Sequence, residues 1–286
     1  MVSVIIPSYN RATTIKKAVD SVLNQTMRDL EVIVVDDGSD DNTSVVIESI
    51  HDTRVRYVKQ ENLGACVARN TGIAEAKGEY IAFHDSDDIW HPDKLEKQMK
   101  VIEIQNADIV FCRLIKINDD ETKEYKPDWE QEGFLNPIVS LFGIGTQTII
   151  GKREVFEEFQ FDKALPRFQE FDLLYRAVKK YSIYYLKEGL VDYYVGSDSI
   201  SSDPRKVLIA CKLLVSKYPE LTKKYVVMGE RMANFLLESG FEMKTKGQAD
   251  ISQYLKLALK CSHSPKVLIK SVMIWAGLFS IWKNIK

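Results

Sequence analysis

Short apolar segments alternate with helical patterns over the first third of the chain, and this alternation limits the fold more than any other feature. Four segments are predicted as strands, at residues 2–6, 31–35, 55–59 and 79–84. Between them, apolar residues recur at helical spacing, at residues 11–25, 45–50 and 64–77. Because strands that alternate with helices form a mostly parallel sheet covered on both faces, we predict an α/β fold with a central sheet flanked by helices.

The pattern changes again in the second half of the chain. Further helices are predicted at residues 94–105, 153–159 and 168–181, and further strands at 109–117, 146–151 and 183–194. The polar residues 123–137 are expected to form an irregular loop. Strand patterns then stop, and four helices are predicted, at residues 206–218, 221–239, 249–261 and 265–284. We therefore expect a domain boundary at residues 202–205.

Charge, cysteine spacing and hydropathy exclude several classes of protein. The formal net charge is −2, which gives no electrostatic reason to expect a nucleic-acid partner. The four cysteines are far apart and match no zinc-binding spacing, so we expect buried, reduced thiols in a cytoplasmic protein. A proline and a polar turn follow the first apolar residues, unlike a signal peptide. No apolar stretch reaches the roughly 18 residues of a membrane span.

Polar side chains follow three of the predicted strands at the points where the strands end. Ser8-Tyr9-Asn10 follows the first strand, Asp36-Asp37 the second and Asp85-Ser86-Asp87-Asp88 the fourth. In open α/β sheets, ligands bind beyond the carboxyl ends of the strands. We therefore expect the three segments to meet in one ligand site.

Three carboxylates within four residues make the segment 85–88 a candidate metal site. Such close carboxylates repel one another, and Mg²⁺ or Mn²⁺ held by one or two of them and by substrate phosphates would neutralise the charge. A cation there would also stabilise a departing diphosphate. The alternative is an acidic turn that caps the helix beginning near His91. The position after a buried strand favours the metal site.

The first two strand ends offer groups that suit a nucleoside. The carboxylate of Asp37 can accept a hydrogen bond from the ring N–H of a base, and the ring of Tyr9 can stack on the base. Asp-Gly-Ser is also strong turn chemistry, so Asp36 is expected to cap the turn while Asp37 faces the ligand. Asn10 is expected to cap the next helix.

Further candidates lie on predicted helices. The guanidinium of Arg69 matches the oxygens of a diphosphate, and the alternative is a solvated surface arginine. Glu170 and Asp172 lie at the start of a helix, where a carboxylate could act as a general base toward an acceptor hydroxyl. Helix starts favour acidic residues in any case, so a structural role is the alternative for both.

Six motifs follow one another in order between residues 1 and 201. They are Val4-Ile-Ile-Pro-Ser-Tyr-Asn10, Val34-Val-Asp-Asp-Gly-Ser39, Asn62-Leu-Gly64, Ala68-Arg-Asn-Thr-Gly72, Gly78-Glu-Tyr-Ile-Ala-Phe-His-Asp-Ser-Asp-Asp88 and Gln169-Glu-Phe-Asp-Leu173. Each motif alone is weak, but the ordered set resembles family 2 glycosyltransferases. The resemblance implies the type A glycosyltransferase fold, a nucleotide-diphosphate sugar donor, for which a UDP-sugar is our preference, and inversion at the anomeric carbon.

The resemblance also implies roles for the candidate residues. Asp87 is the expected principal metal ligand, with Asp85 and Asp88 beside it. Contacts with the donor are predicted for Pro7, Tyr9, Asn10, Asp36, Asp37, Arg69 and Ser86. The family's base is usually an Asp in a Glu-Asp pair, whereas the pair here reads Gln169-Glu170. Glu170 is one methylene longer and is our first choice as the base, and Asp172 is the second.

Together these inferences predict a metal-dependent inverting hexosyl- or N-acetylhexosaminyltransferase that modifies a glycan or lipid-linked glycan in cell-surface polysaccharide or glycolipid synthesis. Residues 1–203 would form the catalytic domain, in which 1–115 bind the nucleotide sugar and 116–203 bind the acceptor. Residues 204–286 would form a helical appendage. Two alternatives remain open: a catalytically inactive sugar-nucleotide binder, and a nucleotidyltransferase.

The last predicted helix, at residues 265–284, is apolar around most of its circumference. Two tryptophans lie in it, and lysines flank it at Lys266, Lys270, Lys283 and Lys286. This pattern suits a helix that lies on an anionic bilayer. We therefore expect attachment to the inner face of the cell membrane through this segment, with packing on the protein itself or a homodimer contact as alternatives.

Overall fold

The computed structural model describes residues 1–117, 123–127, 131–135, 141, 143–194, 203–223, 225–247 and 250–276. The chain forms two compact units. The sheet unit consists of Met1–Lys163 and Glu170–Gly196, and the helical unit consists of Ala164–Gln169 and Ser197–Lys286. Among the described residues, no helix is both long and apolar enough to cross a bilayer.

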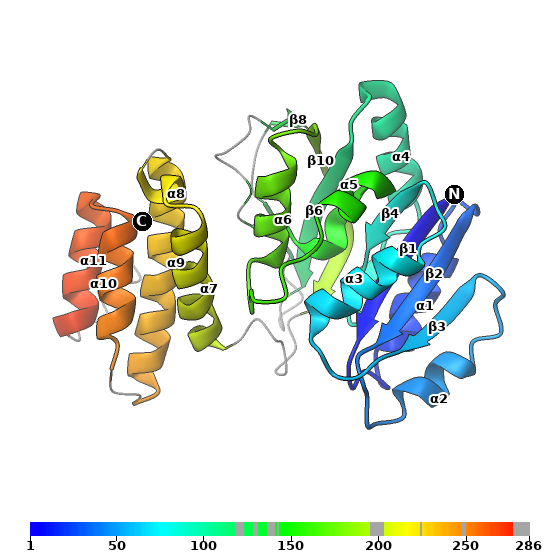
Figure 1. Cartoon of the computed structure of the whole chain (residues 1–286), viewed down its shortest axis with the longest axis horizontal. Coiled ribbons are helices and arrows are strands. Elements are labelled where there is room, and N and C mark those ends of the chain that lie inside the picture. The colour runs from blue at the N-terminus through cyan, green and yellow to red at the C-terminus, as the bar shows by residue number, and fades with distance from the viewer. Residues whose placement is uncertain are drawn as a thin grey trace. The chain divides into compact units, whose positions relative to one another are not determined.

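A mixed sheet forms the centre of the sheet unit (Figure 1), with strands in the order β3-β2-β1-β4-β9-β6-β10-β5. Their bounds are β1 Val2–Ser8, β2 Leu30–Asp36, β3 Val55–Lys59, β4 Tyr80–Phe83, β5 Ile89–Trp90, β6 Ile109–Ile117, β9 Ile149–Lys152 and β10 Ile183–Tyr194. From β3 to β4 all neighbours are parallel. β9 is inserted between β4 and β6 and is antiparallel to both. The predicted α/β fold with a central sheet is confirmed.

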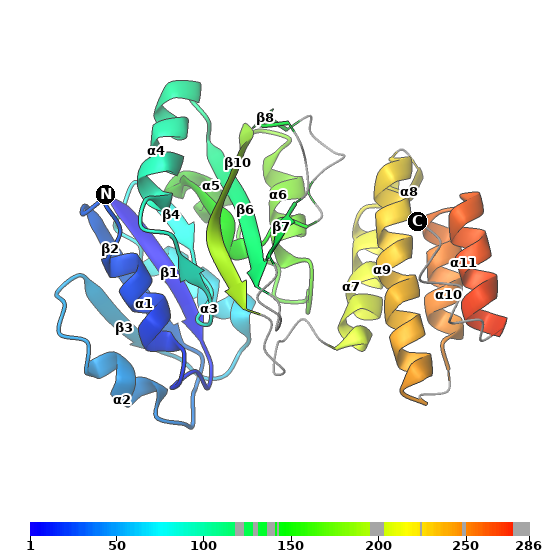
Figure 2. The ribbon, with the colours of Figure 1, turned by 180° about the vertical axis from the view of Figure 1, so that it is seen from behind.

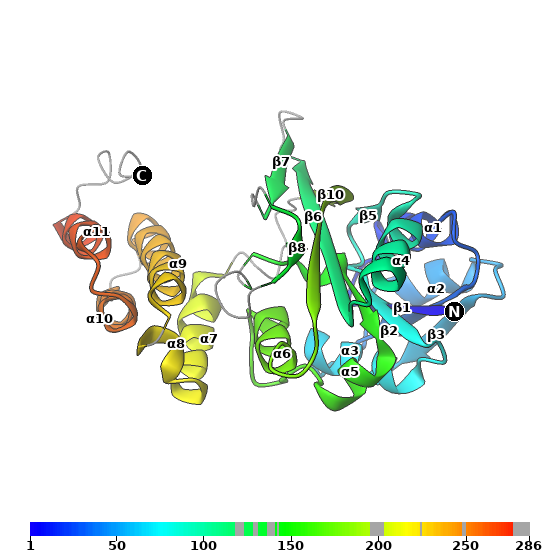
Figure 3. The same ribbon diagram turned by 90° about the horizontal axis from the view of Figure 1, so that it is seen from above.

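Helices cover both faces of this sheet (Figures 2 and 3). One face carries α1 (Ile15–Leu23), α2 (Thr43–Glu48) and α4 (Lys94–Gln105), and the other carries α3 (Ala65–Glu75), α5 (Arg153–Glu158) and α6 (Gln169–Ala177). Every residue of β1 and β2 is buried. Strands that lack an exposed face show continuous apolar runs rather than alternation, which explains the sequence pattern.

Gly72 shows how closely α3 packs on the sheet. A Cβ atom added at this glycine would lie 2.4 Å from Cγ2 of Ile5 in β1. Any larger residue would therefore push α3 away from the strand or force Ile5 to move. This close packing fixes the position of α3, whose first two turns carry Arg69.

One predicted loop contains strands. β7 (Lys123–Lys126) pairs antiparallel with β6, and β8 (Gly133–Phe134) pairs antiparallel with β10. The prediction of irregular structure over residues 123–137 is therefore wrong for these two segments. Short strands at the margin of a sheet bury little apolar surface, so polar residues can form them without an apolar pattern.

The helical unit contains α7 (Pro204–Lys217), α8 (Glu220–Lys223), α9 (Val226–Thr245), α10 (Ser252–Cys261) and α11 (Pro265–Ala276). The predicted helix 221–239 is wrong at both ends, because its start forms α8 and α9 continues six residues further. α9 runs through Gly240, where an added Cβ would lie 3.1 Å from Cβ of Tyr254 in α10. The last predicted helix agrees with α11 to residue 276, and residues 277–286 lie outside the described residues.

Residues 164–169 belong to the helical unit although the chain returns to the sheet unit at Glu170. The ring of Phe168 packs against the ring of Phe235 in α9, with centroids 5.2 Å apart. Phe168 also has a φ of 60°, which is rare for a bulky residue and persists only where the surroundings hold it. The sequence did not indicate that residues 164–169 belong to the helical unit. The predicted functional division between residues 203 and 204 stays a prediction.

Candidate functional site

The carboxyl ends of β2 and β4 emerge on either side of β1 at one edge of the sheet. Ser8 lies opposite Asp36 in the parallel register, and the backbone N–H of Asp37 donates to the Ser8 carbonyl at 2.8 Å. On the other side of β1, the backbone N–H of His84 donates to the Ile5 carbonyl at 2.9 Å. The structure therefore brings the three predicted polar segments to the same edge of the sheet.

Arg11 connects two of these segments directly. Its Nε lies 3.6 Å from Oδ2 of Asp87, and its Nη1 donates to the carbonyl of Asn10 at 3.1 Å. Sequence reasoning ended the first motif at Asn10 and missed this residue. Its only signal was its place directly after the motif.

The three carboxylates of the acidic cluster, defined as Asp85, Asp87 and Asp88, have different surroundings. Asp85 Oδ1 accepts a hydrogen bond from Nη2 of Arg69 at 2.9 Å. Asp88 is buried, and its Oδ2 accepts from Nε2 of Gln147 at 2.8 Å. Its Oδ1 is buried, with no partner within hydrogen-bond distance among the described residues. Asp87 is the most exposed of the three, with 40% of its side chain accessible.

Mutual repulsion and burial disfavour full ionisation of this cluster. Burial, followed by the charge of Asp85, raises the pKa of Asp87. Burial, followed by the charges of Asp85 and Asp87, raises the pKa of Asp88 well above its usual value. A positive charge placed between the carboxylates would reverse both shifts, because an opposite charge favours the ionised form.

The donor atoms of the cluster fit a hard divalent cation that takes other ligands from a substrate. The cluster supplies carboxylate oxygens, which Mg²⁺ and Mn²⁺ prefer, and Oδ1 of Asp88 has no hydrogen-bond partner among the described residues. Among the described residues, no three His, Cys, Asp or Glu side chains gather closely enough to hold a metal ion by themselves. Oxygens of a diphosphate would therefore have to complete the coordination.

Asp36 and Asp37 perform different tasks. Asp36 Oδ1 accepts from the backbone N–H of Ser39 at 2.9 Å, and its Oδ2 accepts from the hydroxyl of Tyr57 at 2.6 Å. Asp36 therefore caps the turn, as expected. The oxygens of Asp37 accept from three groups before α3, namely Gln60 Nε2 at 2.7 Å, the Leu63 N–H at 2.9 Å and the Gly64 N–H at 2.8 Å. A carboxylate offers about four acceptor positions, so the bonds within the described residues leave one position of Asp37 unused.

The remaining predicted donor contacts lie around the same edge. Tyr9 is 42% exposed, whereas Pro7 and Ser86 are buried. Asn10 does not cap α1, which begins after Thr14. Its Oδ1 accepts instead from the backbone N–H of Asp40 at 3.0 Å, so Asn10 joins the loop after β1 to the loop after β2.

Arg69 is not a solvated surface arginine. Only 7% of it is exposed, its guanidinium binds Asp85, and it lies over the ring of Phe161 at 5.5 Å. Arg69 therefore adds positive charge beside the acidic cluster, where a diphosphate bound to a cation would lie.

The structure separates the two candidate bases on α6. Asp172 is fully buried, and its Oδ2 accepts from Nε of Arg176 at 2.9 Å. Glu170 lies in the first turn and is partly exposed. Burial raises the pKa of the Cys66 thiol, in the first turn of α3, to about 12, and the charge of Arg69 opposes this shift.

A buried polar network adjoins Gln147, the residue that bonds to Asp88. The indole N–H of Trp90 donates to the carbonyl of Gln147 at 3.1 Å, and the ammonium of Lys94 lies 3.7 Å above the Trp90 ring. Lys94 Nζ also donates to Gln98 Oε1 at 2.7 Å. His84 is fully buried beside Trp90. Sequence reasoning missed Gln147, because nothing local marks a residue that acts 59 positions away.

Lys94 makes the stability of the sheet unit depend on pH. Burial lowers the pKa of Lys94 from 10.5 to about 8, so between these values the unfolded chain binds more protons and stability rises with pH. Lys94→Met removes this dependence. Between pH 7.5 and 9.5, wild type is expected to gain about 2 kcal/mol relative to Lys94→Met in urea unfolding. Lys100→Met, which changes an exposed lysine of the same helix, should track wild type, and equal slopes for all three proteins would contradict the assignment.

Comparison with known protein families decides the class of the chain. Residues 3–161 match the family described as Glycosyl transferase family 2. The chain belongs to this family. The six motifs, the acidic cluster and the fold are consistent with this family. The family 2 glycosyltransferase is an α/β enzyme with the type A glycosyltransferase fold.

One relative of this glycosyltransferase is named for the synthesis of a lipid-linked sugar. The chain is 31% identical over 239 residues to the UDP-Glc:alpha-D-GlcNAc-diphosphoundecaprenol beta-1,3-glucosyltransferase WfgD of Escherichia coli. The aligned residues cover 82% of this chain and 87% of WfgD. Several Rickettsia glycosyltransferases are longer, and the chain spans 35%, 38% and 40% of three of them.

Two solved structures show the same fold. TarS of S. aureus in complex with UDP-GlcNAc superimposes with a TM-score of 0.61 at 17% identity, covering 99% of this chain and 91% of TarS. The mannosyltransferase PcManGT from Pyrobaculum calidifontis in complex with GDP-Man and Mn²⁺ gives a TM-score of 0.63 at 19% identity, covering 99% of this chain and 82% of PcManGT.

Proposed function

We propose that this glycosyltransferase transfers a hexosyl or N-acetylhexosaminyl group from a UDP-sugar to a hydroxyl of a lipid-linked glycan, with inversion at the anomeric carbon. The observation that carries the proposal is the meeting of the Asp37 loop and the acidic cluster on the two sides of β1. The loop offers an acceptor for a base, and the cluster offers oxygens for a cation that holds the diphosphate.

In this proposal each group at the sheet edge acts on one part of the donor. Tyr9 stacks on the base, and the remaining acceptor position of Asp37 receives the base N–H. Asp87, with Asp85 and Asp88 beside it, would hold Mn²⁺ or Mg²⁺. When bound, that cation supplies charge neutralisation of the departing diphosphate. Arg69 and Arg11 lie against the acidic cluster and add positive charge at the phosphates.

Glu170 is the proposed base. It removes the proton from the acceptor hydroxyl, whose oxygen attacks the anomeric carbon from the face opposite the diphosphate, so the new bond inverts the configuration. Asp172 is held by Arg176 in a buried ion pair, and this contact favours Glu170 over it. The longer side chain of Glu170, compared with an aspartate, places its carboxylate further from the helix backbone.

The acceptor and location follow from the relatives. WfgD is named for a diphosphoundecaprenol acceptor, and a lipid-linked acceptor requires an enzyme that works at a membrane surface. We therefore infer that the enzyme acts on the inner face of the cell membrane and attaches there peripherally. Family membership sets aside the nucleotidyltransferase alternative, whereas the Gln169-Glu170 departure keeps the inactive sugar-nucleotide binder as the rival.

A panel of nucleotide sugars tests the proposal. Thermal unfolding with and without Mn²⁺ is expected to show stabilisation by one UDP-sugar that depends on the cation, because a ligand that binds only the native state raises its stability. Hydrolysis of the same donor separates the enzyme from an inactive binder. Stabilisation without any release of UDP would favour the binder, and stabilisation by a non-uridine donor alone would contradict the proposed base.

Gln147 is predicted to position Asp88 for the cation. Gln147→Leu removes the hydrogen bond to a fully buried carboxylate, which is costly to leave unmade. We expect the Mn²⁺ concentration that gives half-maximal donor stabilisation to rise about tenfold. Gln98→Leu is the matched control, because Gln98 is equally buried but bonds to Lys94 and to backbone carbonyls. Equal half-maximal Mn²⁺ concentrations in the two variants would contradict a specific role of Gln147 in positioning Asp88.

A further inference from the structure

Helix α11 has one buried and one exposed apolar face. Its buried side contacts α9 and α10 through Val267, Ser271 and Ile274. The outward side carries four large apolar side chains, Leu268 at 44% exposed, Ile269 at 51%, Val272 at 62% and Trp275 at 73%. Positions spaced by three and four lie on one face of a helix. Among the described residues no acidic side chain interrupts this face and no other element covers it, so it forms an exposed apolar surface.

The charge around this face differs from that of the rest of the chain. Residues 251–286 contain six lysines and no aspartate or glutamate. The first 250 residues hold the other 33 of the 39 Lys and Arg together with all 41 Asp and Glu. The apolar face of α11 is therefore set in a cationic segment of a chain that is otherwise acidic.

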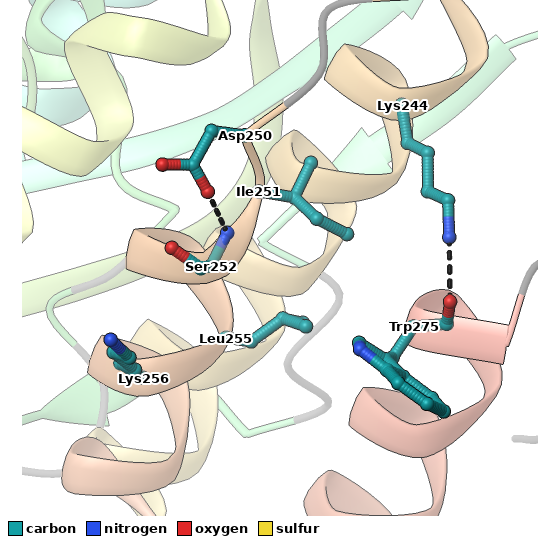
Figure 4. A pocket seen from close by; sticks show the side chains of 7 residues that line it. All are labelled: Lys244, Asp250, Ile251, Ser252, Leu255, Lys256 and Trp275. Atoms are coloured by element: carbon teal, nitrogen blue, oxygen red, sulfur yellow. Dashed lines mark hydrogen bonds between the residues drawn. The ribbon is translucent and has the colours of Figure 1, made fainter.

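A pocket of about 480 Å³ opens beside the same face (Figure 4). Its lining combines apolar and polar residues, namely Ile251, Leu255, Trp275, Lys244, Asp250, Ser252 and Lys256. Lys244 Nζ donates to the carbonyls of Ile274 and Trp275, each at 2.7 Å, and so caps the end of α11. Trp275 is thereby held at the end of an ordered helix, with its ring between the pocket and solvent.

We propose that the outward face of α11 docks on an anionic lipid bilayer. Apolar residues with a tryptophan at one end enter the interfacial layer, while lysines bind anionic headgroups. A second copy of the chain fits less well, because self-association through this face would bring two acid-free, lysine-rich segments together. The docking proposal rests on the lipid-linked acceptor proposed above. It names the surface of the enzyme that would bind the membrane in which this acceptor lies.

Vesicle flotation of the full chain tests the docking. We expect binding to vesicles of phosphatidylcholine with phosphatidylglycerol and little binding to phosphatidylcholine alone. Val272→Glu should weaken binding about tenfold or more, because it places a carboxylate in the apolar interface. Val45→Glu is the matched control, since Val45 in α2 is also 62% exposed and lies in the sheet unit. It should bind as wild type does.

Three outcomes would overturn the docking: no binding, equal binding to neutral and anionic vesicles, or unchanged binding by Val272→Glu. A dimer in light scattering that Val272→Glu dissociates would assign the face to a second copy instead. Donor hydrolysis in solution is measured on every variant. Normal hydrolysis without vesicle binding contradicts the docking alone, whereas vesicle binding without any donor turnover contradicts the proposed function alone.

Discussion

Glu170→Gln is expected to lower the rate of sugar transfer by about 10²–10⁴-fold, the usual contribution of a general base. The amide keeps the size of the side chain but cannot take a proton from the acceptor hydroxyl. Donor affinity should stay within about twofold of wild type, because the residue acts on the acceptor. Transfer is measured under saturating donor, and donor affinity is measured by Mn²⁺-dependent thermal stabilisation.

Asp172→Asn distinguishes the two acids of α6. This change breaks the ion pair between the buried Asp172 and the partly exposed Arg176, so it should reduce the free energy of unfolding by roughly 1–3 kcal/mol. Folded Asp172→Asn protein should still transfer sugar at a rate close to that of wild type. The reverse pattern, with full transfer in Glu170→Gln and none in folded Asp172→Asn, would assign the base to Asp172.

Asp87→Asn is expected to remove donor turnover almost completely, by about 10³-fold or more. The loss of one metal-bound carboxylate weakens the cation that neutralises the departing diphosphate, and such charge stabilisation contributes several kcal/mol to catalysis. Unlike Glu170→Gln, this variant should also lose the thermal stabilisation by donor and Mn²⁺. Removal of metal from wild type with a chelator should give the same two losses, and added Mn²⁺ should restore both.

Asp40→Asn is the control for this experiment. Asp40 is an exposed aspartate on the loop after β2, at the same edge of the sheet, but its side chain is not part of the acidic cluster. It should retain turnover and metal dependence. Full activity of wild type in excess chelator would remove the cation from the proposed mechanism and would leave Arg11 and Arg69 as the groups that stabilise the leaving diphosphate.

The sequence predicted the sheet unit well because its strands are buried on both faces. Continuous apolar runs such as residues 32–35 admit few other structures. The polar groups at the strand ends follow from the same pattern, because adjacent parallel strands must end at one edge. The turn-capping role of Asp36 could thus be predicted from the sequence alone, whereas the ligand contact of Asp37 stays a prediction.

Contacts between distant segments could not be predicted in this way. Gln147 reaches Asp88 only because β9 enters the sheet between β4 and β6, and no local pattern marks that insertion. Asn10 was expected to cap a helix, since asparagine favours caps. Its amide instead joins two loops that meet only in the folded sheet. Residues that bridge separate elements carry no periodic signal, so sequence reasoning missed or misassigned them.

Because residues 164–169 belong to the helical unit, they limit how chimeras of this enzyme and its relatives can be built. A chimera that joined the first 203 residues to a foreign set of C-terminal helices would leave Phe168 without the Phe235 ring on which it packs. The strained backbone of Phe168 lies two residues before Glu170, so the mismatch would reach the proposed base through the chain itself. A chimera that takes its helical unit from a relative therefore also needs the residues of that relative that correspond to 164–169.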